Sequence, residues 1–353
     1  MRWSILVAVL FLFASCNSSS SPSELGSSYQ KLRGNTMGTT YSVIIGRKTK
    51  GIQKKIDKLL VDINAELSTY IPSSTISQIN VAKEKFAIQD TKDYINQNVH
   101  FKKVFSAAKE IHALTKGAFE PTVMPLVNYW GFGPNKKKPE DVDSISIQNL
   151  VQKIGFDKVK KEVVAKDQKL YISKPSQEVA IDFSAIAKGY AVDEIAFLLE
   201  QNAIGNYLVE IGGEVKARGV NQQGKLWSIA LNTPKKEAAL NDAFQILHLE
   251  NIAVASSGNY RNYFELDGKI YSHTLNPKTG YPERSNLLSA TIFSDDCMTA
   301  DAVATACMVG GLEKAKTFLE QGKNIEGYFI YSDEQGALKE YASVGARKYL
   351  NEK

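Results

Sequence analysis

Apolar residues recur at helical spacing in three stretches of the chain. Residues 52–67 place Ile or Leu at intervals of three or four, the pattern of a helix with one buried face. Residues 104–112 and 192–199 repeat this spacing. We interpret all three stretches as helices that pack on the protein core.

Short apolar runs bounded by Gly, Asn or Asp predict strands. They cover residues 40–45, 207–211, 226–231, 244–249, 252–255, 263–266 and 288–293, and residues 156–172 are typical of a hairpin. Several of these strands follow one another without an intervening helix, which favours antiparallel pairing. The sequence therefore predicts an α+β (mixed α/β) protein with two lobes of mixed or antiparallel sheet flanked by helices.

The stretch 179–219 combines these elements around a polar turn. An apolar strand at 179–181 precedes the turn, and a helix follows it. This order places Asp182, Ser184 and Lys188 at one rim, where backbone N–H groups at a helix start attract phosphate. We expect Gly189 to let a bulky ligand approach the backbone closely. An ordinary strand–helix–strand unit with a capped helix would show the same pattern.

A second polar pair lies on the predicted helix 298–311. Asp301 and Thr305 are four residues apart, so they share one helix face. A carboxylate and a hydroxyl on one face suit Mg²⁺, which prefers a few oxygen ligands together with substrate phosphates. Thr299 is the expected N-cap and Gly310-Gly311 the expected stop. The alternative is an Asp in a capping interaction with Thr305 merely packed.

Composition narrows the range of functions. The chain has 353 residues, 43% of them hydrophobic, and a net charge of +5, so it is long enough for one large or two moderate domains. It has no basic block that predicts nucleic-acid binding. Its four histidines lack metal-ligand spacing and it has no Cys-x-x-Cys, which argues against zinc or copper. Cys297 and Cys307 would lie roughly 15 Å apart on a helix, so we expect both to be free.

The N-terminus predicts export and a lipid anchor. Residues 1–16 contain one Arg, an apolar run and small residues before Cys16, which is typical of a signal peptide that ends at a bacterial lipobox cysteine. Residues 17–30 are Ser-rich and suit a flexible tether, with a folded domain over 31–353. We expect the periplasmic side of the bacterial cell envelope, with membrane attachment through Cys16. The alternative is a simple secreted protein.

Nine segments, in order, resemble the ApbE family, the FAD:protein FMN transferases. They are MGTTYSV at 37–43, STY at 68–70, KGAFEPTV at 116–123, WGFG at 130–133, IDFSAIAKGYAVD at 181–193, VEIGGEVKARG at 209–219, ASSGNYRNYF at 255–264, YSHTLNPKTGYP at 271–282 and MTADAVATACMVGG at 298–311. The resemblance covers residues 35–345. It implies an ApbE-like fold with an FAD and Mg²⁺ site between the lobes.

The family resemblance also implies an activity and a set of site residues. The implied enzyme is Mg²⁺-dependent and moves FMN from FAD to a protein Thr or Ser hydroxyl as a phosphoester, releasing AMP. The positions that match FAD-contacting residues are Met37, Tyr70, Ala118, Phe119, Glu120, Asp182, Lys188 and Leu275. The positions that match metal ligands are Ala185, through its backbone carbonyl, Asp301 and Thr305. His273 matches the general base.

Two positions depart from the family pattern, because this chain has Glu120 and Asn276 where the family often has Asp. Glu120 lengthens a carboxylate that the resemblance places near the nucleotide. Asn276 removes a charge near His273 and so would lower the basicity of that histidine if the usual Asp orients it. Turn chemistry alone also explains Asn276, since Asn serves a turn as well as Asp does.

Other functions stay open at this point. A Mg²⁺-dependent FAD pyrophosphatase would give FMN and AMP, and a lipid-anchored flavin-binding protein would catalyse nothing. Family targets carry a D-x-x-[ST]-G-A-[ST]-like acceptor, and this chain has no Ser/Thr-Gly-Ala-Ser/Thr run. We therefore expect another protein as acceptor, such as subunits of the sodium-pumping NADH:quinone oxidoreductase or of Rnf-type complexes.

Overall fold

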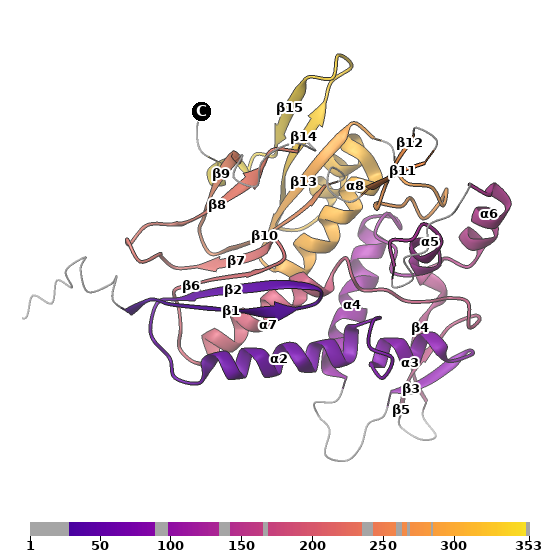
Figure 1. The fold of residues 1–353 in the computed structure, drawn as a ribbon, viewed down its shortest axis with the longest axis horizontal. Coiled ribbons are helices and arrows are strands. Elements are labelled where there is room, and N and C mark those ends of the chain that lie inside the picture. Colours follow the sequence, from indigo (N-terminus) through magenta and orange to yellow (C-terminus); the bar gives the residue numbers. More distant parts are fainter. Residues whose placement is uncertain are drawn as a thin grey trace, which may run out of the picture.

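An eight-stranded antiparallel sheet forms the body of the protein in the computed structural model (Figure 1). The structure describes residues 28–88, 98–133, 142–164, 169–234, 243–258, 263–266, 269–283 and 285–350. In spatial order the strands are β1 (Gln30–Thr36), β2 (Thr39–Ile45), β6 (Tyr207–Ile211), β7 (Glu214–Arg218), β10 (Ile252–Gly258), β13 (Leu287–Ser294), β14 (Ile325–Ser332) and β15 (Leu338–Ala342). Neighbours in the sheet follow one another along the chain, apart from long insertions that carry the other elements.

The predicted amphipathic helices cover one face of this sheet (Figure 1). They are α2 (Ile52–Leu67), α4 (Val99–Leu114), α7 (Ala187–Gln201) and α8 (Cys297–Gln321). The apolar stripe of α2 is buried, which confirms that its periodicity marks core packing. The same holds for the apolar positions of α4 and α7.

The opposite face of the sheet is covered by a hairpin of β8 (Trp227–Asn232) and β9 (Ala243–Leu249). Because strand residues alternate in direction, Ala253 and Ala255 of β10 pack toward the helices while Val254 packs toward this hairpin. Phe329 and Ile330 of β14 divide between the two sides in the same way. Burial on both faces explains why these strands are apolar throughout their length.

A smaller lobe is inserted between β2 and β6 (Figure 1). It holds the three-stranded sheet of β3 (Lys85–Ile88), β5 (Lys169–Ser173) and β4 (Lys160–Val164), with helices α3 (Thr75–Val81), α5 (Met124–Tyr129) and α6 (Ser144–Gln152). The hairpin predicted over 156–172 is confirmed for β4 and β5, although it begins with a 3₁₀ turn, η1 (Phe156–Lys158). Its tip, 165–168, lies outside the described residues.

Two short elements complete the described structure. The hairpin of β11 (Tyr263–Leu266) and β12 (Lys269–Ser272) follows β10, and residues 267–268 between the two strands lie outside the described part. A 3₁₀ turn, η2 (Arg347–Tyr349), packs Tyr349 against Phe293 with the ring centroids 4.8 Å apart.

The prediction of a strand at 179–181 is wrong. These residues join no sheet, and a side chain binds the backbone groups of Ile181 instead. The Asn80 side chain accepts the N–H of Ile181 at 2.7 Å and donates to its carbonyl at 2.8 Å. The next residue, Asp182, donates its N–H to the carbonyl of Pro121 at 2.7 Å. The smaller lobe therefore holds the chain in place just before α7.

Helix α8 differs from its prediction at both ends. The N-cap is Asp296, whose carboxylate accepts the N–H of Thr299 at 2.7 Å, so the prediction of Thr299 as N-cap is wrong. Gly311 has φ 74° and kinks the helix, as expected of a stop, yet helical residues resume directly after it. Asp301 and Thr305 both lie before the kink, in the mostly buried first part of the helix.

The two cysteines agree with the prediction, and the N-terminal segment lies largely outside the described residues. Cys297 and Cys307 are both free and buried, as expected. The predicted signal peptide with Cys16 and nearly all of the tether lie outside the described residues, and β1 begins at Gln30. In the part of the chain that is described, no helix is long and apolar enough to span a membrane.

Candidate active site

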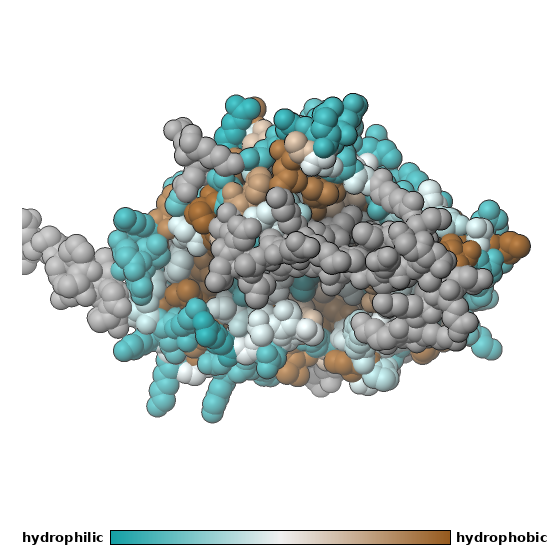
Figure 2. All heavy atoms as spheres, turned by 45° about the horizontal axis from the view of Figure 1, so that its top comes forward, coloured by the Kyte–Doolittle hydropathy of each residue, from teal (hydrophilic) through white to brown (hydrophobic). Residues whose placement is uncertain are grey.

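A cavity of about 990 Å³ collects the predicted site residues. Its walls come from the segment after α4, the turn before α7, the β6–β7 turn, β8, β10, α8 and residues 273–277. The space-filling view shows a hollow near the centre of one face, with hydrophilic side chains toward the outer edge (Figure 2). Of the predicted nucleotide, metal and catalytic residues, all except Met37 line the cavity. Its volume is at the upper end of the usual range for ligand pockets.

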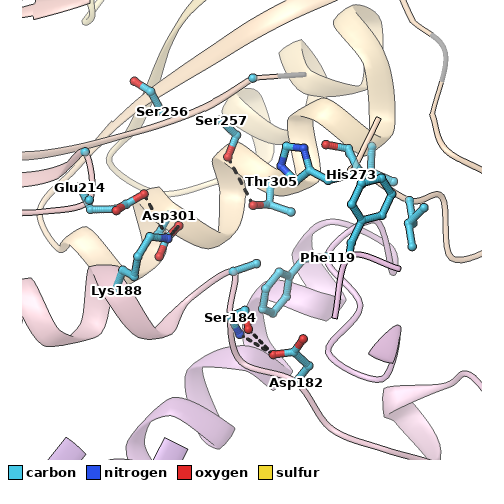
Figure 3. A pocket seen from close by; sticks show the side chains of 18 of the residues that line it. Phe119, Asp182, Ser184, Lys188, Glu214, Ser256, Ser257, His273, Asp301 and Thr305 are labelled. Atoms are coloured by element: carbon cyan, nitrogen blue, oxygen red, sulfur yellow. Dashed lines mark hydrogen bonds and ion pairs between the residues drawn. The ribbon is translucent and has the colours of Figure 1, made fainter. Parts of the chain in front are cut away.

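Asp301 and Thr305 face the cavity from α8 (Figure 3). Asp301 is buried, and its Oδ2 accepts the backbone N–H of Gly189 at 3.0 Å. The Thr305 hydroxyl lies 3.4 Å from the hydroxyl of Ser257. Ala185 lines the same cavity, and its carbonyl would join the carboxylate and the hydroxyl as a hard oxygen donor of the kind that binds Mg²⁺. The residues present therefore fit the implied metal.

The candidate metal site differs from one built from several carboxylates. Among the residues whose positions are described, no group of three or more His, Cys, Asp or Glu side chains could hold a metal ion. The donors that we assign are one carboxylate, one hydroxyl and one carbonyl. Such a set leaves room for phosphate oxygens and water, which Mg²⁺ usually keeps among its ligands.

Gly189 has a different role from the one expected. A Cβ atom at this position would lie 2.2 Å from the carbonyl oxygen of Cys297 and 2.8 Å from the Cβ of Asp301. The group that approaches Gly189 closely is therefore α8 and not a ligand. This close packing of α7 on α8 brings the Gly189 N–H to the Asp301 carboxylate and fixes one of its two oxygens.

We expect Gly189→Ala to destabilise the protein by about 1–3 kcal/mol, the usual cost of overpacking, and to weaken activity by moving Asp301. Urea unfolding and an activity assay would measure the two effects. Gly205→Ala is the matched control, since an added Cβ there meets nothing within 4 Å. Equal unfolding midpoints for the two variants would contradict the close-packing role of Gly189.

Lys188 lies between two carboxylates on the cavity wall (Figure 3). Its Nζ is 3.3 Å from Oε1 of Glu214 and 3.8 Å from Oδ1 of Asp301. Burial disfavours the charged ammonium, but the two carboxylates outweigh it and hold the pKa of Lys188 above its ordinary value. Burial, together with the nearby charge of Asp301, raises the pKa of Glu214 to about 8. Glu214 was not among the predicted site residues.

Asp182 shapes the turn that leads into α7. Its Oδ1 accepts the backbone N–H of Ser184 at 2.8 Å and also the Ser184 hydroxyl (Figure 3). Burial raises the pKa of Asp182, and the two hydrogen bonds from Ser184 oppose this effect. Asp182, Ser184 and Lys188 all line the cavity, which confirms the rim expected from the sequence.

The Glu120 carboxylate is held by a network of donors at the cavity wall. Oε1 accepts the N–H and the hydroxyl of Thr122 at 2.9 and 2.6 Å, together with the N–H of Phe156 at 3.1 Å. Oε2 lies 3.0 Å from Nε2 of His112. Burial works against ionisation, yet the hydrogen bonds from His112 and Thr122 outweigh it, and the pKa of Glu120 lies below its ordinary value of 4.5. The hydrogen bonds of Glu120 therefore connect the turn after α4 to α4 itself and to η1.

Glu120→Ala should lower the free energy of unfolding by about 2–3 kcal/mol, because it leaves buried donors without an acceptor. The folded-state pKa lies below the unfolded value near 4.5, so this stabilisation is present above pH 4.5 and is lost as the pH falls below it. Denaturant unfolding at neutral and at acidic pH measures both effects. Glu313→Ala is the control, since its side chain is 82% exposed. A difference between the two variants that does not shrink in acid would contradict this role.

His273 reaches the cavity from a loop that is fixed by an aromatic turn. The indole Nε1 of Trp130 donates to the carbonyl of Gly280 at 2.8 Å, and the ring of Phe132 packs edge-on against His273 with centroids 6.4 Å apart. Asn276 accepts the N–H groups of two later residues in the same loop, as a turn Asn does. Its amide also donates to Glu283 at 2.8 Å. The structure therefore supports the turn interpretation of Asn276.

Met37 and Tyr70 lie at the margin of the site. Met37 is in the two-residue turn between β1 and β2 and has φ 49°, an uncommon value for a residue with a side chain. An added Cβ at Gly212 would lie 2.9 Å from Thr39 and 3.5 Å from Lys188, which places this turn beside the cavity wall. Tyr70 lines the cavity and is 60% exposed.

Sequence reasoning missed three residues that build the site. Glu214 pairs with Lys188, and the hydroxyl of Ser257 lies beside Thr305. Asp193 binds Lys216 of β7 at 2.8 Å and accepts the N–H of Met298 at 2.9 Å, so it anchors the start of α8. The only signal for them was their place within segments that resemble the family, since polar residues on a mostly apolar helix or strand are otherwise ambiguous.

Comparison with known proteins agrees with this geometry. The model of the ApbE family matches residues 37–329. A curated protein from Haemophilus influenzae, named FAD:protein FMN transferase, is 36% identical over 323 residues and 89% of each chain is covered. A protein of the same name from Vibrio cholerae is 36% identical over 358 residues, with 99% of each chain covered.

Solved structures agree as well. The flavin transferase ApbE from Vibrio cholerae has a TM-score of 0.78 at 33% identity, covering 91% of this chain and 99% of that chain. The apo form of the flavinyl transferase ApbE from Pseudomonas stutzeri has a TM-score of 0.76 at 29% identity, covering 91% and 96%. They confirm the predicted mixed α+β fold. The chain therefore belongs to the ApbE family and is a transferase enzyme.

Proposed function

We propose that the protein transfers the FMN half of FAD to a Thr or Ser hydroxyl of another protein, in a Mg²⁺-dependent reaction that forms a phosphoester and releases AMP. One observation carries this proposal: Asp301, Thr305 and His273 line one cavity of about 990 Å³. The names of the relatives support FAD as donor and a protein as acceptor. A protein that only stores flavin would not need an oxygen-ligand pair and an imidazole in one pocket.

The chain's own residues supply positioning and proton transfer. Asp301, Thr305 and the carbonyl of Ala185 would hold Mg²⁺, which neutralises charge on a pyrophosphate when bound. Lys188 adds a positive charge at the same wall. The acceptor oxygen attacks the FMN-side phosphorus in line, the bond to the bridging oxygen breaks, and AMP leaves with that oxygen. His273 takes the proton from the attacking hydroxyl.

The direct test is covalent labelling of an acceptor. Soluble protein from residue 23 onward is incubated with FAD, Mg²⁺ and a target domain that carries a D-x-x-[ST]-G-A-[ST]-like sequence, for example from a sodium-pumping NADH:quinone oxidoreductase or an Rnf-type complex. We expect a fluorescent band at the mass of the target on a denaturing gel. Replacing the acceptor Thr by Val should remove the band, and a band that persists would contradict transfer to that hydroxyl.

We further propose that the protein is anchored by lipid on the periplasmic side of the bacterial envelope. The support is sequence alone: an apolar leader that ends at Cys16, followed by a Ser-rich tether. Cys16→Ala should abolish labelling by a radioactive fatty acid and move the protein from the membrane fraction to the soluble one. A variant that still takes up lipid would contradict the anchor.

A further inference from the structure

Three ionisable side chains lie together on one wall of the cavity. Lys188 is the ammonium between the carboxylates of Glu214 and Asp301, at 3.3 and 3.8 Å (Figure 3). Glu214 is 5% exposed, and its Oε2 has no hydrogen-bond partner among the described residues. A buried carboxylate oxygen without a hydrogen-bond partner lowers the stability of the fold, so we expect a function that explains why it is there.

A divalent cation on Asp301 would compete with the ammonium of Lys188. Two cations on one carboxylate repel each other strongly in a buried site, where the effective dielectric constant is low. The ammonium must therefore move away from Asp301 when the cation binds. Lys188 already lies nearer to Glu214, and the unpartnered Oε2 offers this ammonium a further hydrogen bond there.

We propose that Glu214 is a positioning residue that draws the Lys188 ammonium away from Asp301 and so opens Asp301 for the divalent cation. The inference rests on the proposed function, because it takes Asp301 as a cation ligand. A bound divalent cation favours the ionised form of Glu214, and with Glu214 ionised the three side chains and the cation sum to one positive charge, which the pyrophosphate of a dinucleotide can neutralise. Without Glu214 the same wall would carry two positive charges.

The test is Mn²⁺ binding by the nucleotide-free protein, measured by electron paramagnetic resonance, so that turnover plays no part. Glu214→Gln should weaken Mn²⁺ binding by about 10- to 100-fold, the usual effect of losing a residue that orients a metal ligand. Glu210→Gln is the matched control, since Glu210 lines the same cavity and binds the Gly213 N–H but forms no ion pair with Lys188 in the described structure. Glu210→Gln should leave the affinity within about threefold.

A double-mutant cycle separates positioning from direct ligation. Lys188→Met removes the ammonium and should bind Mn²⁺ at least as tightly as the wild type. In that background Glu214→Gln should cost less than about threefold, because no ammonium is left to draw away. Glu214→Asp keeps the charge on a shorter side chain and should lie between the wild type and Glu214→Gln. Thermal unfolding of each variant checks the fold, and the double variant has neutral side chains in place of the buried pair, a change that folds tolerate well.

Two results would overturn the inference while leaving the proposed function intact. One is a Glu214→Gln protein that binds Mn²⁺ as the wild type does. The other is an equal loss of affinity in the wild-type and Lys188→Met backgrounds, which would make Glu214 a direct ligand of the cation. A wild-type protein that binds no Mn²⁺, while FAD still binds, would overturn both this inference and the metal site of the proposed function.

Discussion

We expect Asp301→Asn to lower the proposed FMN transfer by about 10²- to 10³-fold, the usual effect of removing a group that stabilises developing charge. The structure gives the reason: the Asp301 carboxylate faces the cavity from α8, its Oδ2 accepts the Gly189 N–H, and its Oδ1 lies 3.8 Å from Nζ of Lys188. An Asn side chain can still accept that N–H through its amide oxygen, but it loses the negative charge that a cation needs. The fold should therefore survive while the Mg²⁺ dependence is lost.

Three measurements separate these effects. Initial rates over a Mg²⁺ titration give the loss of activity, calorimetric titration gives metal affinity, and urea unfolding gives stability. Asp301→Ala is the harsher companion variant, because it also leaves the buried Gly189 N–H without an acceptor and should be less stable than Asp301→Asn by about 1–3 kcal/mol. Full activity of Asp301→Asn at low Mg²⁺ would contradict the assigned metal site.

His273→Ala should slow transfer by about 10²- to 10⁴-fold, the range usual for a lost general base. His273 lines the cavity and its ring packs edge-on against Phe132, so the imidazole is oriented before any substrate arrives. FAD should still bind to the variant, because most of the residues predicted to contact the nucleotide lie at the start of α7, in the turn before it and in the segment that follows α4.

Rates at saturating FAD measure how far transfer is slowed in His273→Ala. Titration with FAD, followed by fluorescence quenching, measures whether the variant still binds FAD. His248→Ala is the matched control, since His248 lies on β9 next to the Ser228 hydroxyl and does not line the cavity. If His273→Ala turned over as fast as His248→Ala, His273 would not be the general base and would have only a packing role.

Periodicity predicted most of the fold because it records burial on one face. The stripe of α2 and the strand β6 lie where the pattern placed them. The failed strand at 179–181 has a long-range cause, since Asn80, 101 residues away from Ile181, binds the backbone there. An apolar run indicates burial but does not reveal which group satisfies its backbone.

The site was predictable to the extent that it follows family motifs. All of the motif-matched site residues except Met37 line one cavity, although their roles in binding and catalysis remain predictions. Glu214 lies in a segment that resembles the family, but its role could not be predicted from the sequence, because that role depends on burial beside Lys188 on another element. Gly189 shows the same limit, since the sequence indicated a close approach and only the packing of α7 on α8 identifies the partner.

The ratio of covalently bound FMN to released AMP tests the transferase proposal most directly. The purified protein is given FAD and Mg²⁺ with or without the acceptor domain, and AMP, free FMN and labelled acceptor are all counted by chromatography. A site that positions a protein hydroxyl and limits water should give one labelled acceptor for each AMP, with little AMP when the acceptor is absent. AMP and free FMN that form at the same rate with and without acceptor, and no covalent product, would contradict the transferase and establish an FAD pyrophosphatase.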